Sequence, residues 1–329
     1  MENDDLILSE DGKTLIGVKD KSITHVVIPE GVTTIGDRAF SWCESLQSID
    51  IPDSVTTIGK KAFSACESLQ SIDLPDSVTT IGDYAFNGCE SLQSIDLPDS
   101  VTTIGKSAFS VCESLQSIDI PNSVTTIGDG AFEYCESLQS IHVAEDNPNY
   151  SSIDGVLFSK NKRTIIRMPL GKKIKEFKIP DSVTIIGKSA FSDCESLQSI
   201  DISKSVTTIG DGAFEYCESL QSIDIPNSVT TIGDGAFSWC ESLQSIHIHH
   251  KNIKDYRIHE DAFYEVDFDE CTLYIPSGTR WAYRHHPAFE DFKNIVTVRE
   301  KMVPLHTVSK LVKKVYQYFT NYFKWGTKR

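Results

Sequence analysis

The sequence predicts a β-rich α/β fold, a solenoid of ten coils with a ladder of strands along one face. The first observation is a unit of 23 residues, typified by residues 46–68, that recurs almost verbatim through the chain. The second is that one unit holds too few apolar residues to form a core, so like units must stack to bury them. The leading residues of the ten units are Ile23, Leu46, Leu69, Leu92, Leu115, Leu138, Ile174, Leu197, Leu220 and Leu243.

Each stretch of one unit has an expected conformation. Residues 48–51 alternate between apolar and polar side chains, which indicates a strand. Pro52 ends that strand because it has no N–H to donate, and residues 55–58 begin a second short extended piece. Gly59 marks a position where a side chain would clash or where φ is positive. Residues 60–66 carry apolar side chains at helical spacing and predict about one helical or 3₁₀ turn.

Two hairpins divide the array into two blocks. Residues 6–18 and residues 156–168 each hold two apolar runs around a polar turn, which is typical of a β-hairpin. The second hairpin lies in an insert at about residues 144–173, so both blocks open in the same way and a duplication is the simplest account. We therefore expect an N-terminal hairpin cap over residues 1–22 and a repeat solenoid over residues 23–248.

The chain beyond the repeats predicts a cap and a separate tail. Residues 249–298 should close the end of the core, with strands at Thr272–Pro276 and Asn294–Val298 and a helix at residues 278–286. Residues 299–329 hold eight bases and one acid, and from position 308 they fit an amphipathic helix. A basic, aromatic-rich helix of this kind lies on a membrane or docks on a partner; the alternatives are packing on the solenoid and dimerisation. The candidate contact residues of this helix are Lys310, Leu311, Lys313, Lys314, Val315, Phe319, Phe323 and Lys324.

The repeat pattern LxxLxLPxxVTxIGxxAFxxCxx resembles that of a known family. It is similar to the BspA-like, or Treponema-type, 23-residue leucine-rich repeat, and residues 147–173 and 271–295 resemble the interrupting and closing segments of such proteins. The resemblance covers roughly residues 5–298 and implies a horseshoe-like leucine-rich-repeat solenoid. It also implies bacterial or protozoan proteins, often displayed on the cell surface, some of which adhere to host proteins or to other cells.

Composition and charge argue against several classes of protein. The formal net charge is −16, whereas a nucleic-acid binder needs bases that neutralise phosphates. No run of the sequence approaches the roughly 20 apolar residues of a membrane span. The acidic N-terminus does not match a secretory signal, so a cytoplasmic location is expected from the residues alone. The family resemblance instead implies the bacterial cell surface or secretion.

A row of outward aspartates on the first strand is one candidate ligand-binding surface. Carboxylates on adjacent coils, about 5 Å apart, repel one another, so cations or basic ligands should collect there. The alternative is a solvated face that resists aggregation through its strand edges. No enclosed cage of oxygens is expected, so the sequence predicts neither a metal nor a cofactor. The row consists of Asp50, Asp73, Asp96, Asp119, Asp201 and Asp224.

Variation between the copies points to a second candidate surface. Four positions beside the Ala-Phe pair differ from unit to unit, although most others are copied. They introduce Trp42, Tyr134, Tyr216 and Trp239, which as exposed side chains would be typical interface anchors. The alternative is that these positions face solvent and vary freely.

The cysteines are predicted to form a reduced ladder in the core. Eight of the nine share one repeat position between apolar residues, and their equivalent side chains point in parallel rather than toward one another. These residues are Cys43, Cys66, Cys89, Cys112, Cys135, Cys194, Cys217 and Cys240.

The sequence thus predicts a non-enzymatic module that binds a protein or a surface ligand on an extended repeat face. Phosphate loops, HExxH, GxSxG and paired catalytic acids do not appear, which makes an enzyme the least favoured hypothesis. The alternative is a peripheral membrane-associated scaffold held by residues 308–325. A monomer or a dimer is expected, and the partner is a protein that the sequence does not identify.

Overall fold

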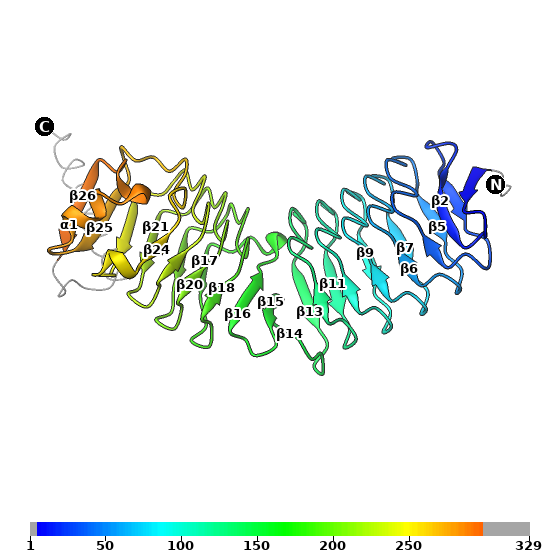
Figure 1. The fold of residues 1–329 in the computed structure, drawn as a ribbon, viewed down its shortest axis with the longest axis horizontal. Coiled ribbons are helices and arrows are strands. Elements are labelled where there is room, and N and C mark those ends of the chain that lie inside the picture. Colours follow the sequence, from blue (N-terminus) through cyan, green and yellow to red (C-terminus); the bar gives the residue numbers. More distant parts are fainter. Residues whose placement is uncertain (1–4, 299–329) are drawn as a thin grey trace, which may run out of the picture.

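The computed structural model describes residues 5–298, and it confirms the solenoid (Figure 1). The coils follow one another along a single arc, from the blue N-terminal end to the orange C-terminal end. The arc bends in its green central part, around the insert. The described chain contains very little helix, so short strands and turns build almost the whole fold.

The first row of strands contains the Ser-Ile-Asp segment of the regular coils and the equivalent residues of the divergent ones. Neighbouring strands run parallel and equivalent residues face each other, as Asp73 faces Asp96. The repeat dictates this register, because a shift of one residue would turn the buried isoleucines to solvent. The described members of this row are β3 (His25–Val27), β5 (Ser48–Asp50), β7 (Ser71–Asp73), β9 (Ser94–Asp96), β11 (Ser117–Ile120), β13 (Ser140–Val143), β17 (Glu176–Lys178), β19 (Ser199–Asp201), β21 (Ser222–Ile225), β23 (Ser245–Ile248), β25 (Thr272–Pro276) and β26 (Asn294–Val298).

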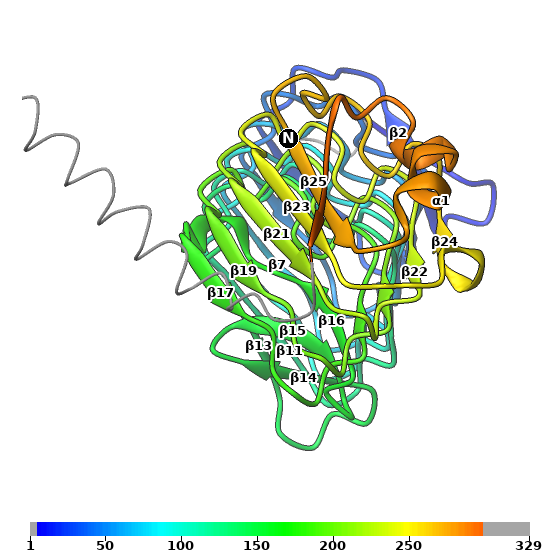
Figure 2. The ribbon, with the colours of Figure 1, turned by 90° about the vertical axis from the view of Figure 1, so that its left-hand side faces the viewer.

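A second row, which the sequence predicted only as short extended pieces, lies across the core from the first. Figure 2 shows β22 and β24 on one side of the solenoid and β21 and β23 on the other. Each strand has a half-exposed or exposed first residue and, in nearly every coil, a buried isoleucine, and it pairs in parallel with the next coil. The strands of this row are β4 (Thr34–Ile35), β6 (Thr57–Ile58), β8 (Thr80–Ile81), β10 (Thr103–Ile104), β12 (Thr126–Ile127), β18 (Ile185–Ile186), β20 (Thr208–Ile209), β22 (Thr231–Ile232) and β24 (Arg257–Ile258).

The segment around the Ala-Phe pair is not the helical or 3₁₀ turn expected from its spacing. It forms two successive turns, and Lys61 and Ala65 adopt positive φ values of 56° and 60° that end any helix. The N–H groups of Lys61, Phe63 and Ala65 instead donate to the next coil, with N···O distances of 2.7–2.8 Å. Together with the two rows of strands, these hydrogen bonds connect each coil to its neighbour along three sides.

Both predicted hairpins are present and have the same turn. β1 (Leu6–Leu8) pairs with β2 (Thr14–Val18), and β15 (Val156–Ser159) pairs with β16 (Thr164–Arg167); β14 (Tyr150–Ile153) adds a third strand to the second hairpin. In the first turn the Ser9 hydroxyl accepts from the N–H of Thr14 at 2.9 Å, and in the second the Ser159 hydroxyl accepts from that of Thr164 at 3.0 Å. The same hydrogen bonds in both turns support the duplication.

The core contains a stack of phenylalanine rings, one from each coil. Consecutive rings such as Phe63 and Phe86 lie parallel, with centroids 5.2 Å apart, and are fully buried. The stack breaks between Phe132 and Phe191, where the insert places Met168 in the equivalent position, with its N–H bonded to the Ala190 carbonyl at 2.8 Å. The apolar core therefore divides into two clusters that meet at the insert.

Asn147 closes the end of the first block. Its side chain is fully buried, and its Nδ2 donates to the carbonyls of Pro121 at 2.7 Å and Val124 at 2.9 Å. Its Oδ1 accepts from the N–H groups of Asn149 and Tyr150 at 2.9 and 2.8 Å. One side chain thus satisfies four backbone groups where the regular coils stop.

The C-terminal module continues the array further than the sequence indicated. Its two strands coincide with the predicted ones, and the predicted helix is present as the shorter α1 (Arg280–Arg284). Phe263 extends the ring stack at 5.3 Å from Phe237, and β24 extends the second row. Residues 257–265 therefore complete the tenth coil, whose second half the sequence analysis placed in the cap. The remaining short elements of the structure are η2 (Leu170–Lys172), η3 (Ile253–Asp255) and η4 (Pro287–Phe289).

Within residues 5–298, no helix has the length and hydropathy to span a bilayer. The basic helix expected at residues 308–325, with all of its candidate contact residues, lies outside the described part of the chain.

Candidate functional site

In the second turn of each coil, the residue two positions after the phenylalanine of the Ala-Phe pair has a left-handed backbone in every coil that contains the pair. This position is occupied by Trp42, Tyr134, Tyr216 and Trp239 in four coils, with φ between 56° and 64°. Left-handed backbone costs a residue with a side chain roughly 1–2 kcal/mol, and glycine escapes most of that cost. Gly88 fills the same position in another coil, so the fold accepts glycine there, yet four coils keep a large ring.

The structure brings only some of these rings together. Trp42 is 65% exposed at the N-terminal end, whereas Tyr134 lies beside the insert and is 46% exposed. The Tyr216 and Trp239 rings stack with centroids 5.7 Å apart, on adjacent coils. The prediction that Trp239 is exposed was wrong: it is half-buried because Tyr216 packs on one side and Tyr264 on the other.

Tyr264 extends this group and was not predicted. Its ring meets Trp239 edge to face at 6.1 Å and is 51% exposed. It was missed because its coil departs from the repeat, although the Ala262-Phe263 pair just before it carries the repeat signal. We define the aromatic edge as Trp42, Tyr134, Tyr216, Trp239 and Tyr264.

Carboxylates surround the aromatic edge from the fifth coil onward. Burial, together with the charges of Asp193 and Glu133, raises the pKa of Glu215. Burial also raises the pKa of Asp193, although the Ser192 hydroxyl and the Arg167 guanidinium act in the opposite direction. Burial and the negative charge of Asp193 raise the pKa of the Tyr134 phenol. These shifts place Tyr134 among carboxylates that come from both sides of the insert.

The first four coils have the opposite character at the same positions beside the Ala-Phe pair. The Lys61 ammonium lies over the Tyr84 ring, 5.3 Å from its centroid, which is the geometry of a cation–π contact. Arg38 occupies the equivalent position of Lys61 in the preceding coil, beside the exposed Trp42. An ammonium group from the chain itself therefore covers an aromatic ring in this half.

The aspartate row lies on the first row of strands, where it was predicted, but its charges are not uniform. Asp50 Oδ2 lies 3.7 Å from His25 Nε2, and Asp224 Oδ1 lies 2.5 Å from His249 Nε2. The hydrogen bond that the His249 imidazole donates to the Asp224 carboxylate raises the pKa of His249. In the strand register, Asp119 faces His142 and Asp201 faces Lys178, while Asp73 and Asp96 face each other. Adjacent carboxylates therefore occur within each block, and histidine or lysine side chains flank them at the ends of these runs.

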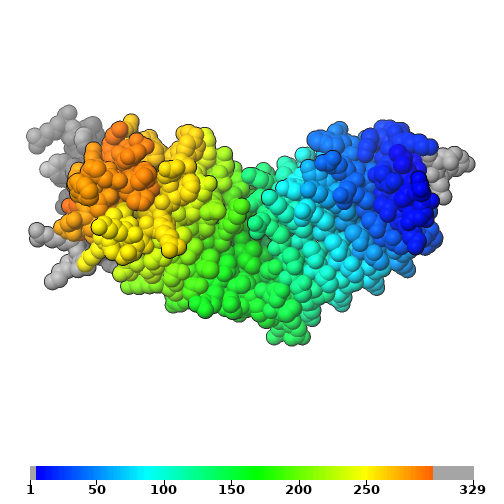
Figure 3. All heavy atoms as spheres, viewed as in Figure 1, coloured from blue at the N-terminus to red at the C-terminus, as the bar shows by residue number. Residues whose placement is uncertain are grey.

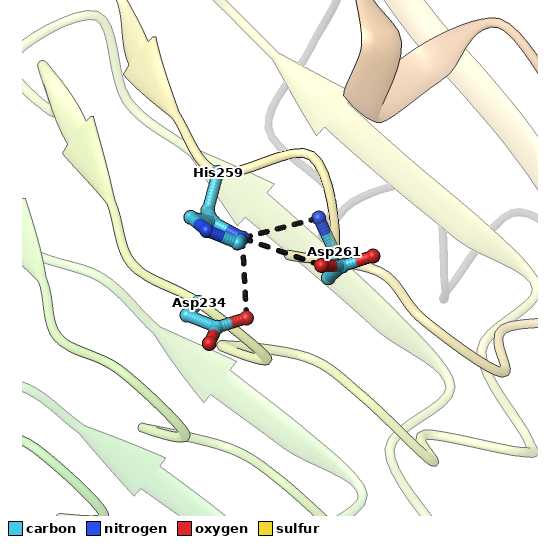
Figure 4. A group of neighbouring side chains, drawn as sticks. All are labelled: Asp234, His259 and Asp261. Atoms are coloured by element: carbon cyan, nitrogen blue, oxygen red, sulfur yellow. Dashed lines mark hydrogen bonds and ion pairs between the residues drawn. The ribbon is translucent and has the colours of Figure 1, made fainter.

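A histidine and two aspartates meet on the surface near the C-terminal module (Figure 4). His259 Nδ1 lies 3.1 Å from Asp234 Oδ1 and 3.7 Å from Asp261 Oδ2. The same nitrogen accepts the Asp261 N–H at 3.3 Å, and all three side chains are exposed. The arrangement is an open surface cluster of one imidazole and two carboxylates, and nothing in it encloses a metal.

All nine cysteines are reduced and buried, which confirms the predicted ladder. In regular coils the thiol donates to the phenylalanine carbonyl of the preceding coil, as Cys89 Sγ does to Phe63 O at 3.2 Å. Burial raises the pKa of the Cys89 and Cys240 thiols to about 12.

Because the thiolate is the nucleophile, the native protein should resist alkylation. Iodoacetamide at pH 8 is expected to modify no ladder cysteine without denaturant and all of them in 6 M guanidinium, as read by mass spectrometry. Rapid modification of the folded protein would contradict this.

The comparisons with known proteins agree with this architecture. The family model for the BspA type leucine rich repeat region matches residues 18–139, 57–171 and 168–295. None of the curated proteins matches the chain. A leucine-rich repeat protein from Eubacterium ventriosum has a similar solved structure, with 27% identity and a TM-score of 0.67 over 89% of this chain and 82% of that one.

Two further solved structures extend the comparison. A leucine-rich repeat protein from Bacteroides ovatus shares 28% identity, with a TM-score of 0.59 over 89% of this chain and 74% of that one. A leucine rich cell surface protein from Faecalibacterium prausnitzii shares 27% identity, with a TM-score of 0.55 over 90% and 93% of the two chains. Since the family model covers most of the sequence and the fold agrees with it, the chain belongs to the family of BspA type leucine-rich repeat proteins.

Proposed function

We propose that this chain is a non-enzymatic protein-binding or adhesion module, and that the aromatic edge is its binding surface. Leucine-rich repeat proteins generally mediate protein interaction or adhesion. The observation that carries the choice of surface is the set of large rings held at a left-handed backbone position that glycine fills in a sister coil. Backbone strain retained on an exposed surface is typical of functional positions.

The shape of the molecule supports recognition rather than catalysis. Figure 3 shows a long continuous surface with a concave outline, formed by successive coils of similar profile. Equivalent side chains recur on adjacent coils, so this surface offers repeated contacts to an extended ligand. Tyrosine and tryptophan supply large contact areas with few rotatable bonds, which is why they dominate the energetics of many interfaces.

The test removes rings without straining the fold. Trp42→Gly deletes an exposed ring and relieves a left-handed residue, so its stability is expected to remain equal or to rise by up to about 1 kcal/mol. Trp239→Gly gains the same relief but loses the ring contacts with Tyr216 and Tyr264, so a net loss of about 1–2 kcal/mol is expected. Val111→Gly is the matched control, because Val111 occupies the same position with φ of 60° but carries no ring. The measurement compares the proteins captured from cell extracts and from extracellular matrix by the wild type and by each variant.

We expect Val111→Gly to retain the captured partner and at least one tryptophan variant to lose it by tenfold or more. If the wild type and both tryptophan variants captured the same proteins in equal amounts, the aromatic edge would not be the binding surface. Thermal unfolding of each variant, followed by circular dichroism, confirms that a lost partner does not reflect lost structure.

A further inference from the structure

The charge of the aromatic edge reverses along the solenoid. In the first four coils, the variable positions beside each Ala-Phe pair hold four bases and two acids; from the fifth coil to the last they hold nine acids and one base. The bases of the first part are Arg38, Lys60, Lys61 and Lys106, with the acids Asp37 and Asp83. The nine acids of the later part are Asp129, Glu133, Asp193, Asp211, Glu215, Asp234, Glu260, Asp261 and Glu265.

We propose that the acidic part of the aromatic edge, made of Tyr134, Tyr216, Trp239 and Tyr264 with these nine acids, binds a basic segment of a partner protein. Lysine and arginine side chains of the segment would lie against the rings while their charges face the carboxylates. The proposal rests on the proposed function and names the chemistry of the partner.

The first block supplies the model for this contact. There the Lys61 ammonium already lies 5.3 Å from the Tyr84 centroid, across two adjacent coils. In the later coils the rings lie after the Ala-Phe pair rather than just before it, and the four variable positions hold carboxylates but a single base, Lys188. A cation over these rings therefore has to come from another chain segment, and a cation–π contact beside a carboxylate is stronger than either interaction alone in water.

The carboxylates of this surface are crowded in a way that a bound cation would relieve. Asp193 and Glu215 repel each other and Glu133 across the insert, and burial weakens the hydration that would otherwise stabilise the charges of Asp193 and Glu215. The nearby Arg167 is buried and donates its Nη1 to the Ser189 carbonyl at 2.7 Å, so it offsets this repulsion only in part. Ammonium and guanidinium groups of a basic segment would compensate the remaining charge.

The experiment titrates the full chain with a dye-labelled twelve-residue peptide of alternating lysine and glycine, followed by fluorescence anisotropy. The same peptide with glutamate in place of lysine is the negative control. Trp239→Ala is expected to weaken binding by about three- to thirtyfold, which is the range of a partly desolvated cation–π contact. Trp42→Ala, in the basic part of the edge, is expected to change binding less than twofold.

A second pair of variants isolates the charges. Asp211 and Asp37 occupy the same position, and each Oδ1 accepts the N–H of the next coil, at 3.1 Å from Asp234 N and 2.8 Å from Lys60 N. Asparagine keeps that acceptor oxygen, so Asp211→Asn and Asp37→Asn differ only in which half loses a charge. We expect Asp211→Asn to weaken the binding of the lysine peptide and to reduce the salt dependence of that binding. Asp37→Asn should do neither.

Three outcomes would overturn the proposal. Equal losses in the two halves of the edge would indicate general attraction to an acidic solenoid. Equal binding of the glutamate peptide would exclude charge recognition. Tighter binding of the lysine peptide to a full-length variant with Lys310, Lys313 and Lys314 changed to glutamine would assign the surface to the chain's own basic tail. If these peptides fail while Trp239→Gly still abolishes partner capture, the proposed function stands and only the basic chemistry of the partner is wrong.

Discussion

Replacing Asn147 by alanine is expected to lower the free energy of unfolding by about 3–5 kcal/mol. The substitution removes four hydrogen bonds at once and leaves two carbonyls and two N–H groups without their partner in the closed end of the first block. Each buried polar group left unsatisfied costs about 1–3 kcal/mol, and water reaches only part of this site because Asn147 is fully buried. Urea unfolding followed by circular dichroism measures the loss.

Asn149→Ala is the matched control for this prediction. Asn149 is two residues away and exposed, and its side chain makes one bond, from Nδ2 to the Thr125 carbonyl. It should cost less than about 1 kcal/mol, because water replaces an exposed partner. A comparable effect of the two variants would mean that Asn147 does not close the block in the way its contacts indicate.

Gly105→Ala is expected to destabilise the protein by about 3 kcal/mol. A Cβ atom at Gly105 would lie 2.5 Å from the backbone nitrogen of Asp83 and 2.5 Å from the carbonyl carbon of Gly82. Both atoms belong to the preceding coil, and that coil is bonded along three sides, so the contact is relieved only by separating the coils. Overpacking of this kind costs about 1–3 kcal/mol, and rigid backbone on both sides places the expected value at the upper end.

Gly88→Ala distinguishes this clash from the general cost of replacing glycine. Gly88 has φ of 74°, but a Cβ there would meet only ordinary contacts, the nearest at 3.6 Å. Its cost should be about 1 kcal/mol, from the left-handed backbone alone. Differential scanning calorimetry of both variants tests the difference, and equal shifts of the unfolding temperature would contradict the proposed clash.

Most of the fold was predictable because the same pattern of apolar and polar residues recurs in each repeat. The alternation in residues 48–51 determines which side chains are buried, and an identical neighbour then determines the register. The turns around the Ala-Phe pair were not predictable in the same way. Helical spacing of apolar residues is also compatible with two tight turns, and neither Lys61 nor Ala65 is a residue type that favours a left-handed backbone.

The candidate site was predictable only in part. Variation between copies identified the four ring positions, because selection for the common core leaves few other positions free to differ. It did not indicate that Trp239 packs against two neighbours, since contacts between coils depend on the direction in which each turn points its side chain. Tyr264 escaped because its coil retains the Ala-Phe pair but little else of the repeat.

The in-register pairing of near-identical coils has a genetic consequence. Loss or gain of one 23-residue unit inside a block would restore every strand pair, ring contact and thiol bond with a copy of the same residues, so recombination between the repeats of the gene can change the length of the protein without unfolding it. Each event would move the basic and acidic parts of the aromatic edge by one strand spacing, about 4.8 Å. The distance between two contact regions can thus be adjusted in fixed steps while the contact residues themselves stay unchanged.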